Sequence, residues 1–425
     1  MIKIYEYSEI TKDDIFARTE CKVDVTDIVK EIIENVKNNG DKALFEYSKK
    51  FDNADLSCLE VSEEEIDEAI SSVDEKMIAI ITEAKENIEY FHKNQIRNSF
   101  IANDKKGVVM GQKVLPIDKV GLYVPGGTAA YPSSVLMNCI PAKLAGVSEI
   151  VMVTPASGGK INPNILAAAR ISGVDRIFKI GGAQAVAALA YGTESVPRVD
   201  KIVGPGNAFV AEAKRQVFGQ VAIDMIAGPS EILVIADSTN EPSHIAADLL
   251  SQAEHDKNAS AVLVTDSLPF AKLVQEEVAR QVELLPRKEI ASVSIDNNGK
   301  IIVVDSIYSA IEISNEIAPE HLEICVDNPF DYLDSVRHAG SVFLGKNCPE
   351  ALGDYMAGPN HTLPTSGTAR FSSPLSVDDF VKKMQYTYFT DDAFCKIADK
   401  VAYFAESEGL SAHARSALVR KDNNK

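Results

Sequence analysis

Several features that are typical of secreted, membrane or zinc-finger proteins are missing from this sequence. No apolar run reaches the roughly 18 residues that a membrane-spanning helix needs, and the start has no basic segment followed by an apolar one. No pair of cysteines has the CxxC spacing, which favours reduced thiols over a disulfide framework or a cysteine-ligated zinc. The six cysteines lie far apart, at Cys21, Cys58, Cys139, Cys325, Cys348 and Cys395. We therefore expect a cytoplasmic protein with no membrane partner.

Positive charge is also scarce. The chain has 43 Lys and Arg residues against 62 Asp and Glu residues, which gives a formal net charge of -19. Such an acidic surface repels nucleic-acid phosphates and anionic lipid headgroups, so we expect no nucleic-acid partner. With 425 residues, the chain exceeds the size at which one hydrophobic core stops growing. At least two globular units are predicted.

Two catalytic fingerprints are absent as well. The chain contains no GxGxxG, the glycine pattern of typical dinucleotide-binding turns, and no HExxH, the pattern of many zinc peptidases. A zinc peptidase of that kind is therefore excluded. A nucleotide site, if there is one, must be built from other turns.

The first part of the chain is predicted to be helical and charged. Residues 24–99 carry apolar positions at helical spacing, and Ser62 with Glu65 forms a capping box at the start of one such helix. Charged runs of this kind are typical of solvated helix faces. We interpret this part as scaffold and expect His92 to lie on its surface.

From Lys119 onward the pattern predicts alternating strands and helices. Short β-branched runs end in Gly or Pro and lead into helices, which is typical of βαβ units with parallel sheets. The fold class is therefore α/β, with two tandem incomplete Rossmann-like units, N-terminal helices and a helical C-terminal extension. In the second unit we predict helices over residues 243–255, 267–285, 307–317 and 329–338.

The predicted domain boundaries follow from this pattern, with the junction of the two units near residues 227–231. A short segment, 1–20, precedes an α/β domain made of residues 21–120 and 232–375. Residues 121–231 form the other α/β domain. The segment 376–425 is too short to fold alone, so it must dock on its own body or on a partner subunit.

Three glycine-containing turns follow strands of the first unit. They are "VPGG", "GGAQA" and "GPGNA", and they would line the carboxyl edge of one sheet, where open α/β sheets bind ligands. Each turn alone is explained equally well by the backbone needs of a tight turn. Together they favour a dinucleotide.

A set of nitrogen and oxygen ligands lies in the second unit. Gln252 and His255, at i and i+3 near a helix end, share one face, whereas His244 lies too far back along the helix to join them. The polar loop 351–370 adds Asp354 and His361. These side chains suit zinc without sulfur, but each also has a structural explanation as a turn former, a loop anchor or a surface residue.

A carboxyl group and an imidazole stand on consecutive residues in "IAPEHLEIC". Neighbouring side chains diverge on helices and strands, so Glu320 and His321 cannot form a simple hydrogen-bonded dyad on one face. From these nine residues alone, an inert first helical turn after the proline is an equally good interpretation.

Eight ordered stretches between Lys119 and Arg420 closely resemble the histidinol dehydrogenase family. They are "VGLYVPGGTAAYPSSVLM", "GGAQAVAALAYGT", "KIVGPGNAFV", "GPSEILVIAD", "DLLSQAEHD", "APEHLEI", "GDYMAGPNHTLPTSGTARF" and "EGLSAHARSALVR". The resemblance implies oxidation of L-histidinol through L-histidinal to L-histidine with two NAD, one zinc ion per subunit, and a homodimer whose C-terminal segment crosses to the other subunit. It also implies that the active site is shared between the subunits.

The resemblance further implies roles for individual residues. Glu320 would activate water, and His321 would be the base toward the alcohol and the aldehyde hydrate. NAD would contact Tyr123, Gln184 and Asn207. Zinc would be held by Gln252, His255, Asp354 and His413. The substrate would lie against Ser230, Gln252, His255, His321, Asp354, His361, Glu408 and His413.

Two other functions stay open on the sequence. One is a different zinc- and NAD-dependent amino-alcohol dehydrogenase, in which Ser230, His361 and Glu408 would select another substrate. The other is a non-catalytic two-domain binding protein, because strands and glycine turns also build binding clefts.

Overall fold

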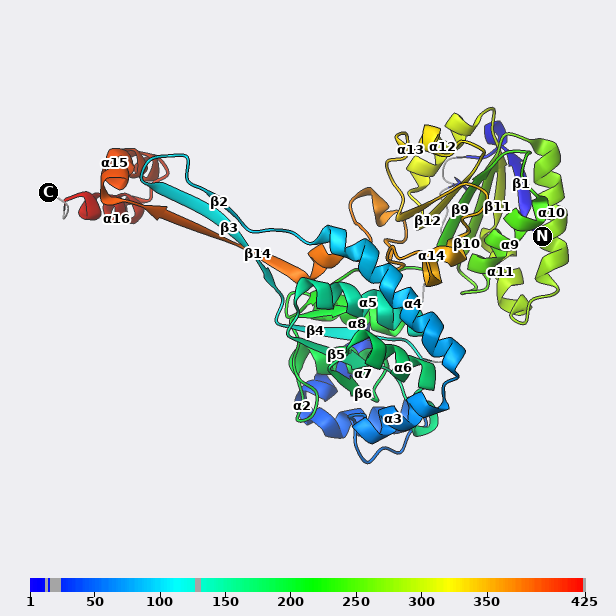
Figure 1. The fold of residues 1–425 in the computed structure, drawn as a ribbon, viewed down its shortest axis with the longest axis horizontal. Coiled ribbons are helices and arrows are strands. Elements are labelled where there is room, and N and C mark those ends of the chain that lie inside the picture. The colour runs from blue at the N-terminus through cyan, green and yellow to red at the C-terminus, as the bar shows by residue number, and fades with distance from the viewer. Residues whose placement is uncertain (12–13, 16–23, 127–130, 423–425) are drawn as a thin grey trace. The chain divides into compact units, whose positions relative to one another are not determined.

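The computed structural model describes residues 1–11, 14–15, 24–126 and 131–422 (Figure 1). The chain forms two compact units, described separately below. Unit 1 comprises Met1–Gln95 and Ile117–Phe380, and unit 2 comprises Ile96–Pro116 and Val381–Lys425. No helix within the described ranges is long and apolar enough to span a bilayer. Cys21 lies outside those ranges, and the other five cysteines are free thiols, as predicted.

Unit 1 contains a six-stranded sheet, sheet A, with strand order β1-β11-β10-β9-β12-β13. All five strand pairs are parallel. From β9 the next strands in sequence, β10 and β11, are added on one side, whereas β12 and β13 are added on the other, so the strand order reverses between β9 and β12. The strands are β1 (Lys3–Glu6), β9 (Glu231–Ala236), β10 (Ser260–Thr265), β11 (Lys300–Val303), β12 (His321–Cys325) and β13 (Ser341–Leu344).

Helices cover both faces of sheet A, which explains why β9 and β12 are buried along their whole length. One face packs against α9, α10 and α11, and the other against α12. The helices are α9 (Pro242–Ala253), α10 (Leu268–Val282), α11 (Lys288–Asn298), α12 (Ile307–Ile317), α13 (Phe330–Leu333) and α14 (Glu350–Tyr355). Three of the four predicted helices are confirmed in position, but the fourth is only the short α13, and α11 was not predicted.

The second sheet of unit 1, sheet B, has five parallel strands in the order β6-β5-β4-β7-β8. Its progression reverses between β4 and β7. The strands are β4 (Lys119–Tyr123), β5 (Glu149–Val153), β6 (Arg176–Phe178), β7 (Lys201–Val203) and β8 (Ala222–Ile223). The predicted fold class, α/β with two Rossmann-like units, is confirmed.

The N-terminal helices pack on sheet B. One face of the sheet buries α2, α7 and α8, and the other buries α3, α4, α5 and α6. The sequence had grouped residues 21–120 with 232–375, which differs from this packing. The helices are α2 (Thr26–Phe51), α3 (Glu63–Ser72), α4 (Glu75–His92), α5 (Pro132–Ala145), α6 (Pro163–Ser172), α7 (Gly182–Tyr191) and α8 (Ala208–Val217). For residues 24–99, sequence patterning predicted helices but not the sheet that they cover.

Two local predictions in this region have opposite outcomes. The capping box is confirmed: Glu65 N–H donates to Ser62 Oγ over 3.2 Å, and Ser62 N–H donates to the Glu65 carboxylate over 2.8 Å. The surface placement of His92 was wrong, because the side chain is fully buried and its Nδ1 lies 2.9 Å from the carbonyl oxygen of Ile88. His92 therefore points toward the core, although its neighbours Tyr90 and Phe91 in the last turn of α4 are exposed.

Unit 2 is an antiparallel sheet followed by two helices. Strand β14 (Val381–Phe389) pairs along its whole length with β3 (Val108–Pro116), which also pairs with β2 (Phe100–Ala102). Helices α15 (Asp391–Ser407) and α16 (Ser411–Asp422) follow. The sequence had predicted the segment 376–425 as helical throughout, so β14 corrects that prediction. The missed strand pairs with residues some 270 positions earlier, a partner that local patterning does not reveal.

Candidate functional site

The predicted catalytic residues lie at the amino edge of sheet A. His321 is the first residue of β12, and Glu231 is the first residue of its parallel neighbour β9, with His321 opposite Ile232. This is the place where the strand order reverses. Ligands of open α/β sheets usually bind at the carboxyl edge of such a reversal, so the site uses the opposite edge.

The main chain of Glu231 contacts both members of the pair. Its N–H donates to Glu320 Oε2 over 2.9 Å, and its carbonyl oxygen lies 2.9 Å from His321 Nδ1. Because a carbonyl can only accept, we assign the imidazole proton to Nδ1. The second ring nitrogen, Nε2, then carries a lone pair.

His321 is almost completely buried. Burial lowers the pKa of His321 to about 4, although the negative charge of Asp354 acts in the opposite direction. The imidazole is therefore neutral at physiological pH. Its ring lies against Phe343, with 6.1 Å between the ring centroids. Such a ring is held in one orientation with Nε2 ready to accept a proton.

Glu320 lies on the Nδ1 side of this ring. Its Oε2 is 3.7 Å from His321 Nδ1, beyond hydrogen-bonding distance. Burial, together with the nearby charges of Glu231, Asp354 and Glu350, raises the pKa of Glu320 well above its ordinary value. The carboxyl group and Nε2 thus occupy different sides of the imidazole, in line with the predicted divergence of the two side chains.

Helix α9 brings Gln252 to this edge of the sheet. The helix starts after the carboxyl end of β9 and runs back, so its last turn meets the amino edge. Gln252 is fully buried, with Nε2 3.1 Å from His321 Nδ1 and with no hydrogen-bond partner for Oε1. His255 follows the last turn and is exposed, and its N–H donates to the carbonyl of Gln252 over 3.1 Å.

Asp354 and His361 meet near the same place. His361 Nδ1 lies 3.5 Å from Asp354 Oδ1, and its Nε2 lies 3.4 Å from Ser134 Oγ. Burial alone would raise the pKa of Asp354, but His361, His321 and His255 outweigh burial and lower it. The carboxylate of Asp354 is therefore ionised, with the imidazole of His361 3.5 Å away.

One glycine allows α14 to approach β13 closely. A Cβ atom on Gly353 would lie 2.5 Å from the ring of Phe343, the same ring that packs against His321. A larger residue would push α14 away from the sheet. Gly353 therefore helps to bring its neighbour Asp354 close to His321.

Glu350 is a site residue that the sequence analysis missed. It is only 2% exposed, and its Oε1 lies 3.8 Å from His321 Nε2 with no hydrogen-bond partner. Burial and the charge of Asp354 raise the pKa of Glu350. One signal was present: Glu350 precedes Asp354 by four residues, which puts both carboxylates on one face of a helical turn.

These side chains fit a metal ion. Among the described residues, His321, Glu350 and Asp354 form a group whose ligand atoms all lie within 4.8 Å of one another. Buried polar atoms normally have a partner, yet Gln252 Oε1, His321 Nε2 and Glu350 Oε1 have none. Oxygen and imidazole-nitrogen donors suit a divalent cation such as zinc.

The predicted cofactor residues lie at the carboxyl edge of sheet B. Tyr123 ends β4, Asn207 caps α8 after β7, and Gln184 lies in the first turn of α7. Tyr123 and Asn207 therefore flank the reversal point between β4 and β7. The three glycine turns lie at one edge of the sheet, as predicted. This holds for the residues that the structure describes, which do not include Gly127 of "VPGG".

These turns are in direct contact. The hydroxyl of Tyr123 accepts a hydrogen bond from Gly182 N–H over 3.0 Å, and burial raises the pKa of Tyr123 to about 12. Gly204 has a φ of +114°, and a Cβ there would lie 2.1 Å from the carbonyl oxygen of Tyr123. Glycine is thus required where two main chains meet, as in a cradle for a dinucleotide.

A buried ion pair fixes the turn at Gly204. Lys214 Nζ pairs with Asp224 and also donates to the carbonyl oxygen of Gly204 over 2.9 Å. The carboxylate of Asp224 accepts from Gly204 N–H over 2.8 Å. Both main-chain groups of this glycine are therefore bound by charged side chains.

The remaining predicted substrate residues have less contact with the site. Ser230 is half-buried directly before Glu231, and its carbonyl accepts from Ser260 N–H over 3.0 Å. Glu408 and His413 belong to unit 2, where both side chains are exposed. The residues brought together in unit 1 are Gln252, Glu320, His321, Glu350, Asp354 and His361.

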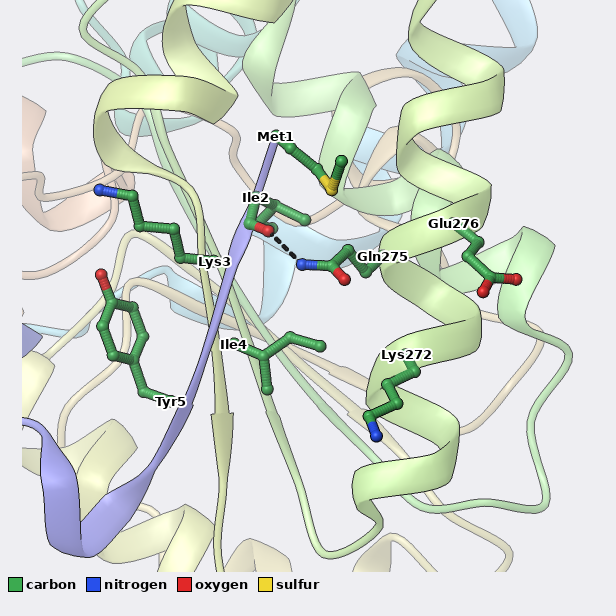
Figure 2. Close-up of a pocket in the computed structure, with 8 residues that line it drawn as sticks. All are labelled: Met1, Ile2, Lys3, Ile4, Tyr5, Lys272, Gln275 and Glu276. Carbon is green, nitrogen blue, oxygen red and sulfur yellow. Dashed lines mark hydrogen bonds between the residues drawn. The ribbon is translucent and has the colours of Figure 1, made fainter.

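A surface hollow of about 610 Å³ lies elsewhere on unit 1, between β1 and α10 (Figure 2). The amide of Gln275 spans it and donates to the carbonyl oxygen of Ile2 over 2.6 Å. Three strands separate β1 from β12 in sheet A. The hollow is therefore not part of the candidate site at the amino edge of β9 and β12.

Comparisons with known proteins agree on one class. The family model "Histidinol dehydrogenase" matches residues 17–421. Histidinol dehydrogenase from Clostridium acetobutylicum is 61% identical over 393 residues, 92% of this chain and 91% of the relative. The protein of that name from Bacillus thuringiensis subsp. konkukian is 57% identical over 392 residues, with the same coverage of each chain.

A solved structure supports the same assignment. The crystal structure of histidinol dehydrogenase from Elizabethkingia anophelis has a TM-score of 0.94 at 42% identity, and the match covers 100% of this chain and 99% of that one. The fold and these matches define an oxidoreductase built on two α/β sheets. The chain belongs to the histidinol dehydrogenase family.

Proposed function

We propose that this protein oxidises L-histidinol through L-histidinal to L-histidine, using two NAD and one water, with a zinc ion in the active site. The observation that carries the proposal is the hydrogen bond from His321 Nδ1 to the Glu231 carbonyl, which fixes the tautomer of the imidazole. Its Nε2 is then a buried acceptor beside Glu350 and Asp354. A base of this kind is what the oxidation of an alcohol demands.

Each of the two oxidations requires a proton acceptor. Oxidising the alcohol removes the hydroxyl proton as hydride leaves carbon, and oxidising the aldehyde needs a water molecule and then a proton from its hydrate. The complete reaction releases a carboxylate, two NADH and three protons. A neutral imidazole with an unprotonated Nε2 suits the proton removal of both steps. We assign that role to His321.

Glu320 is proposed to activate the water. Its raised pKa keeps the carboxyl protonated in the absence of a cation, and a nearby positive charge would favour the ionised form. The cationic amine of histidinol supplies such a charge. The proposed zinc ion would supply a positive charge as well, so Glu320 would be ionised once metal and substrate are bound.

The zinc ligands are proposed to be Gln252, His255 and Asp354 of one chain with His413 of a second copy. Four protein ligands close a tetrahedral shell, so substrate binding requires expansion to five or six ligands. When bound, zinc orients the imidazole and amine of histidinol, and NAD accepts the hydride. The buried, unpartnered Oε1 of Gln252 supports this ligand set.

NAD is proposed to bind at the carboxyl edge of sheet B, against Tyr123, Gln184 and Asn207. The reversal between β4 and β7 and the glycine turn at Gly204 support this placement. Asn207 Oδ1 is already engaged with the N–H groups of Phe209 and Val210. Its amide NH₂ is the group left to contact the cofactor.

A homodimer in the cytoplasm is proposed, with unit 2 reaching the second copy. Large patches of exposed apolar side chains mark interaction surfaces, and unit 2 is rich in such residues. They include Phe100, Ile101, Met384, Tyr388, Tyr403, Phe404, Leu410 and Leu418. The active site would be shared, because Glu408 and His413 come from this unit.

A related zinc- and NAD-dependent amino-alcohol dehydrogenase is the second candidate. Ser230, His361 and Glu408 would then select a different amino alcohol. The contact of His361 with Ser134 and Asp354 makes it the best placed of the three to set the substrate shape.

The deciding experiment measures NADH and histidine formed by the purified protein from L-histidinol and NAD. We expect about two NADH per histidinol, loss of activity on chelation and recovery on adding zinc. One NADH per substrate with accumulating aldehyde would contradict the four-electron reaction. Turnover of another amino alcohol in preference to histidinol would favour the second candidate.

A further inference from the structure

The loop 356–367, which follows α14, is tied to two helices of sheet B. Asn87 Nδ2 of α4 donates to the carbonyl oxygen of Met356 over 2.9 Å. Asn360 Nδ2 donates to the carbonyl oxygen of Met137 in α5 over 2.7 Å. The loop therefore has fixed contacts with the helices that cover the other sheet of unit 1.

The bond between Asn360 and Met137 fills a gap that a proline leaves in α5. In a regular helix the N–H of the residue four positions later binds each carbonyl. For Met137 that residue is Pro141, which has no N–H to donate. Met137 is completely buried, and the amide of Asn360 supplies the donor from outside the helix. Helix α5 thus presents a buried carbonyl to a neighbouring segment, and Asn360 binds it.

Asn360 also fixes the main chain on both sides of His361. Its Oδ1 accepts from Thr362 N–H over 2.8 Å, and the residue is only 4% exposed. The imidazole between these two residues reaches Ser134 Oγ at 3.4 Å and Asp354 Oδ1 at 3.5 Å. The position of the His361 ring therefore depends on the two hydrogen bonds of the Asn360 amide.

Helix α5 belongs to the proposed cofactor side of unit 1. It comes after β4, the strand that ends at Tyr123, and it packs on sheet B. Hydride transfer requires cofactor and substrate to be held close together, and a displacement of about 1 Å can cost about 100-fold in rate. A bond from the loop of His361 to this helix therefore acts on the alignment of the two reactants.

We propose that Asn360 is a positioning residue, which holds the loop of His361 against α5 through the carbonyl that Pro141 leaves without a helical donor. The inference rests on the proposed oxidation of histidinol. Both ends of the Asn360 amide are engaged by main-chain groups, so the residue acts through His361 and through the contact with α5.

The first test compares Asn360→Ala with Asn240→Ala in the full-length zinc-loaded protein. Asn240 is also buried and donates to a carbonyl oxygen over 2.7 Å, but its partner is Cys325 at the carboxyl end of β12, opposite the candidate site. The measurements are kcat with NAD and the isotope effect from L-histidinol deuterated at the alcohol carbon. For Asn360→Ala we expect kcat to fall about 10-fold or more and the isotope effect to rise, because misaligned hydride transfer becomes slower than the other steps. For Asn240→Ala we expect an unchanged isotope effect.

A purely structural role for Asn360 would give a different result. Loss of folded enzyme lowers the apparent kcat but leaves the isotope effect as it is in the wild type. An unchanged isotope effect in Asn360→Ala, or an equal rise in Asn240→Ala, would overturn the inference while the proposed function stands. Wild-type protein that forms no NADH from L-histidinol would overturn the proposed function itself. If Asn360→Ala does not fold, Asn360→Asp replaces it, since the aspartate keeps an oxygen for Thr362 N–H and loses the amide NH₂.

Urea unfolding tests the part that Pro141 plays. In Pro141→Ala the new N–H can bind the carbonyl of Met137, so this carbonyl keeps a partner when the Asn360 amide is removed. We expect Asn360→Ala to lower the urea midpoint less in the Pro141→Ala protein than in the wild-type protein. Equal losses in the two backgrounds would overturn the inference, because the carbonyl would then not depend on Asn360.

Discussion

His321 Nδ1 lies 2.9 Å from the carbonyl oxygen of Glu231, and this contact between neighbouring strands decides which nitrogen of the imidazole can act as a base. The same residue donates its N–H to Glu320. The two side chains of the proposed catalytic pair are thus held by the main-chain N–H and carbonyl of one residue. Main-chain groups cannot be removed by substitution, so the orientation of the pair is built into the pairing of β9 with β12.

The pH dependence of kcat/KM should reflect the lowered pKa of His321. Because burial lowers it below the ordinary 6.5, His321 stays unprotonated until the pH falls well below that value. We expect the acid limb attributable to this group to lie below pH 6.5 and activity to fall as the pH decreases through it. A pH profile measured with saturating zinc at each pH checks this, and an acid limb above 6.5 would contradict it.

Substitutions of the two proposed catalytic side chains should affect the two oxidations differently. His321→Asn should reduce both half-reactions by about 10²–10⁴-fold, the usual contribution of a general base. Glu320→Gln should spare the oxidation of histidinol relative to that of histidinal, because only the second step needs water. The two steps are measured separately with each substrate. Equal loss of both steps in Glu320→Gln would refute the division of roles.

The buried pair of Lys214 and Asp224 should matter for stability and for the cofactor. Their side chains are 3% and 1% exposed, so Lys214→Met leaves an unpaired carboxylate in the core. We expect a loss of about 3–5 kcal/mol in unfolding free energy. A raised KM for NAD should accompany it, since Gly204 loses a contact.

A surface pair provides the matched control for that prediction. Arg280 pairs with Glu277 at the surface and is 58% exposed, so Arg280→Met should lower the unfolding free energy far less than Lys214→Met. Urea unfolding of both variants measures the difference. A Lys214→Met protein as stable as Arg280→Met would show that the buried pair contributes nothing specific.

A shared active site should allow complementation between inactive variants. Asp354 belongs to unit 1 and His413 to unit 2. If the proposed site takes one residue from each copy, mixing Asp354→Ala with His413→Ala should form one intact site per heterodimer. We expect recovery toward about half of the wild-type activity per heterodimer. Purified heterodimers without activity would indicate a site built within one chain.

Local patterns predicted much of unit 1 from sequence. Continuous apolar runs such as "EILVIA" marked strands buried on both faces, and Ser62 with Glu65 marked a helix start that the structure confirms. The pairing of β14 with β3 was missed because its hydrogen bonds join segments far apart in the chain. The burial of His92 was missed for the related reason that it depends on the packing of α4 against another element.

In the candidate site, too, features set by local sequence could be predicted and features set by contacts between distant segments could not. Glu320, His321, Gln252 and Asp354 were candidates from their local settings, but only the resemblance to the histidinol dehydrogenase family gave them roles. Glu350 offered only its spacing of four residues from Asp354 as a signal, since its place in the site depends on a 3.8 Å approach to His321 across two elements. The hydrogen bonds of the Glu231 main chain could not be predicted from the sequence either, because main-chain N–H and carbonyl groups are common to nearly all residues.

The two sheets of unit 1 end differently at their carboxyl edges. In sheet B the strands β4, β6 and β7 lead into glycine turns, whereas in sheet A the strands β9, β10, β11 and β12 are followed within two residues by Asp237, Asp266, Asp305 and Asp327. Such an acidic edge disfavours a pyrophosphate, which leaves the edge of sheet B as the proposed cofactor site. Under the proposed reaction, the two cofactors must then be used in turn. NADH must leave and fresh NAD must enter while the aldehyde stays bound, so cofactor exchange has to be faster than escape of the aldehyde.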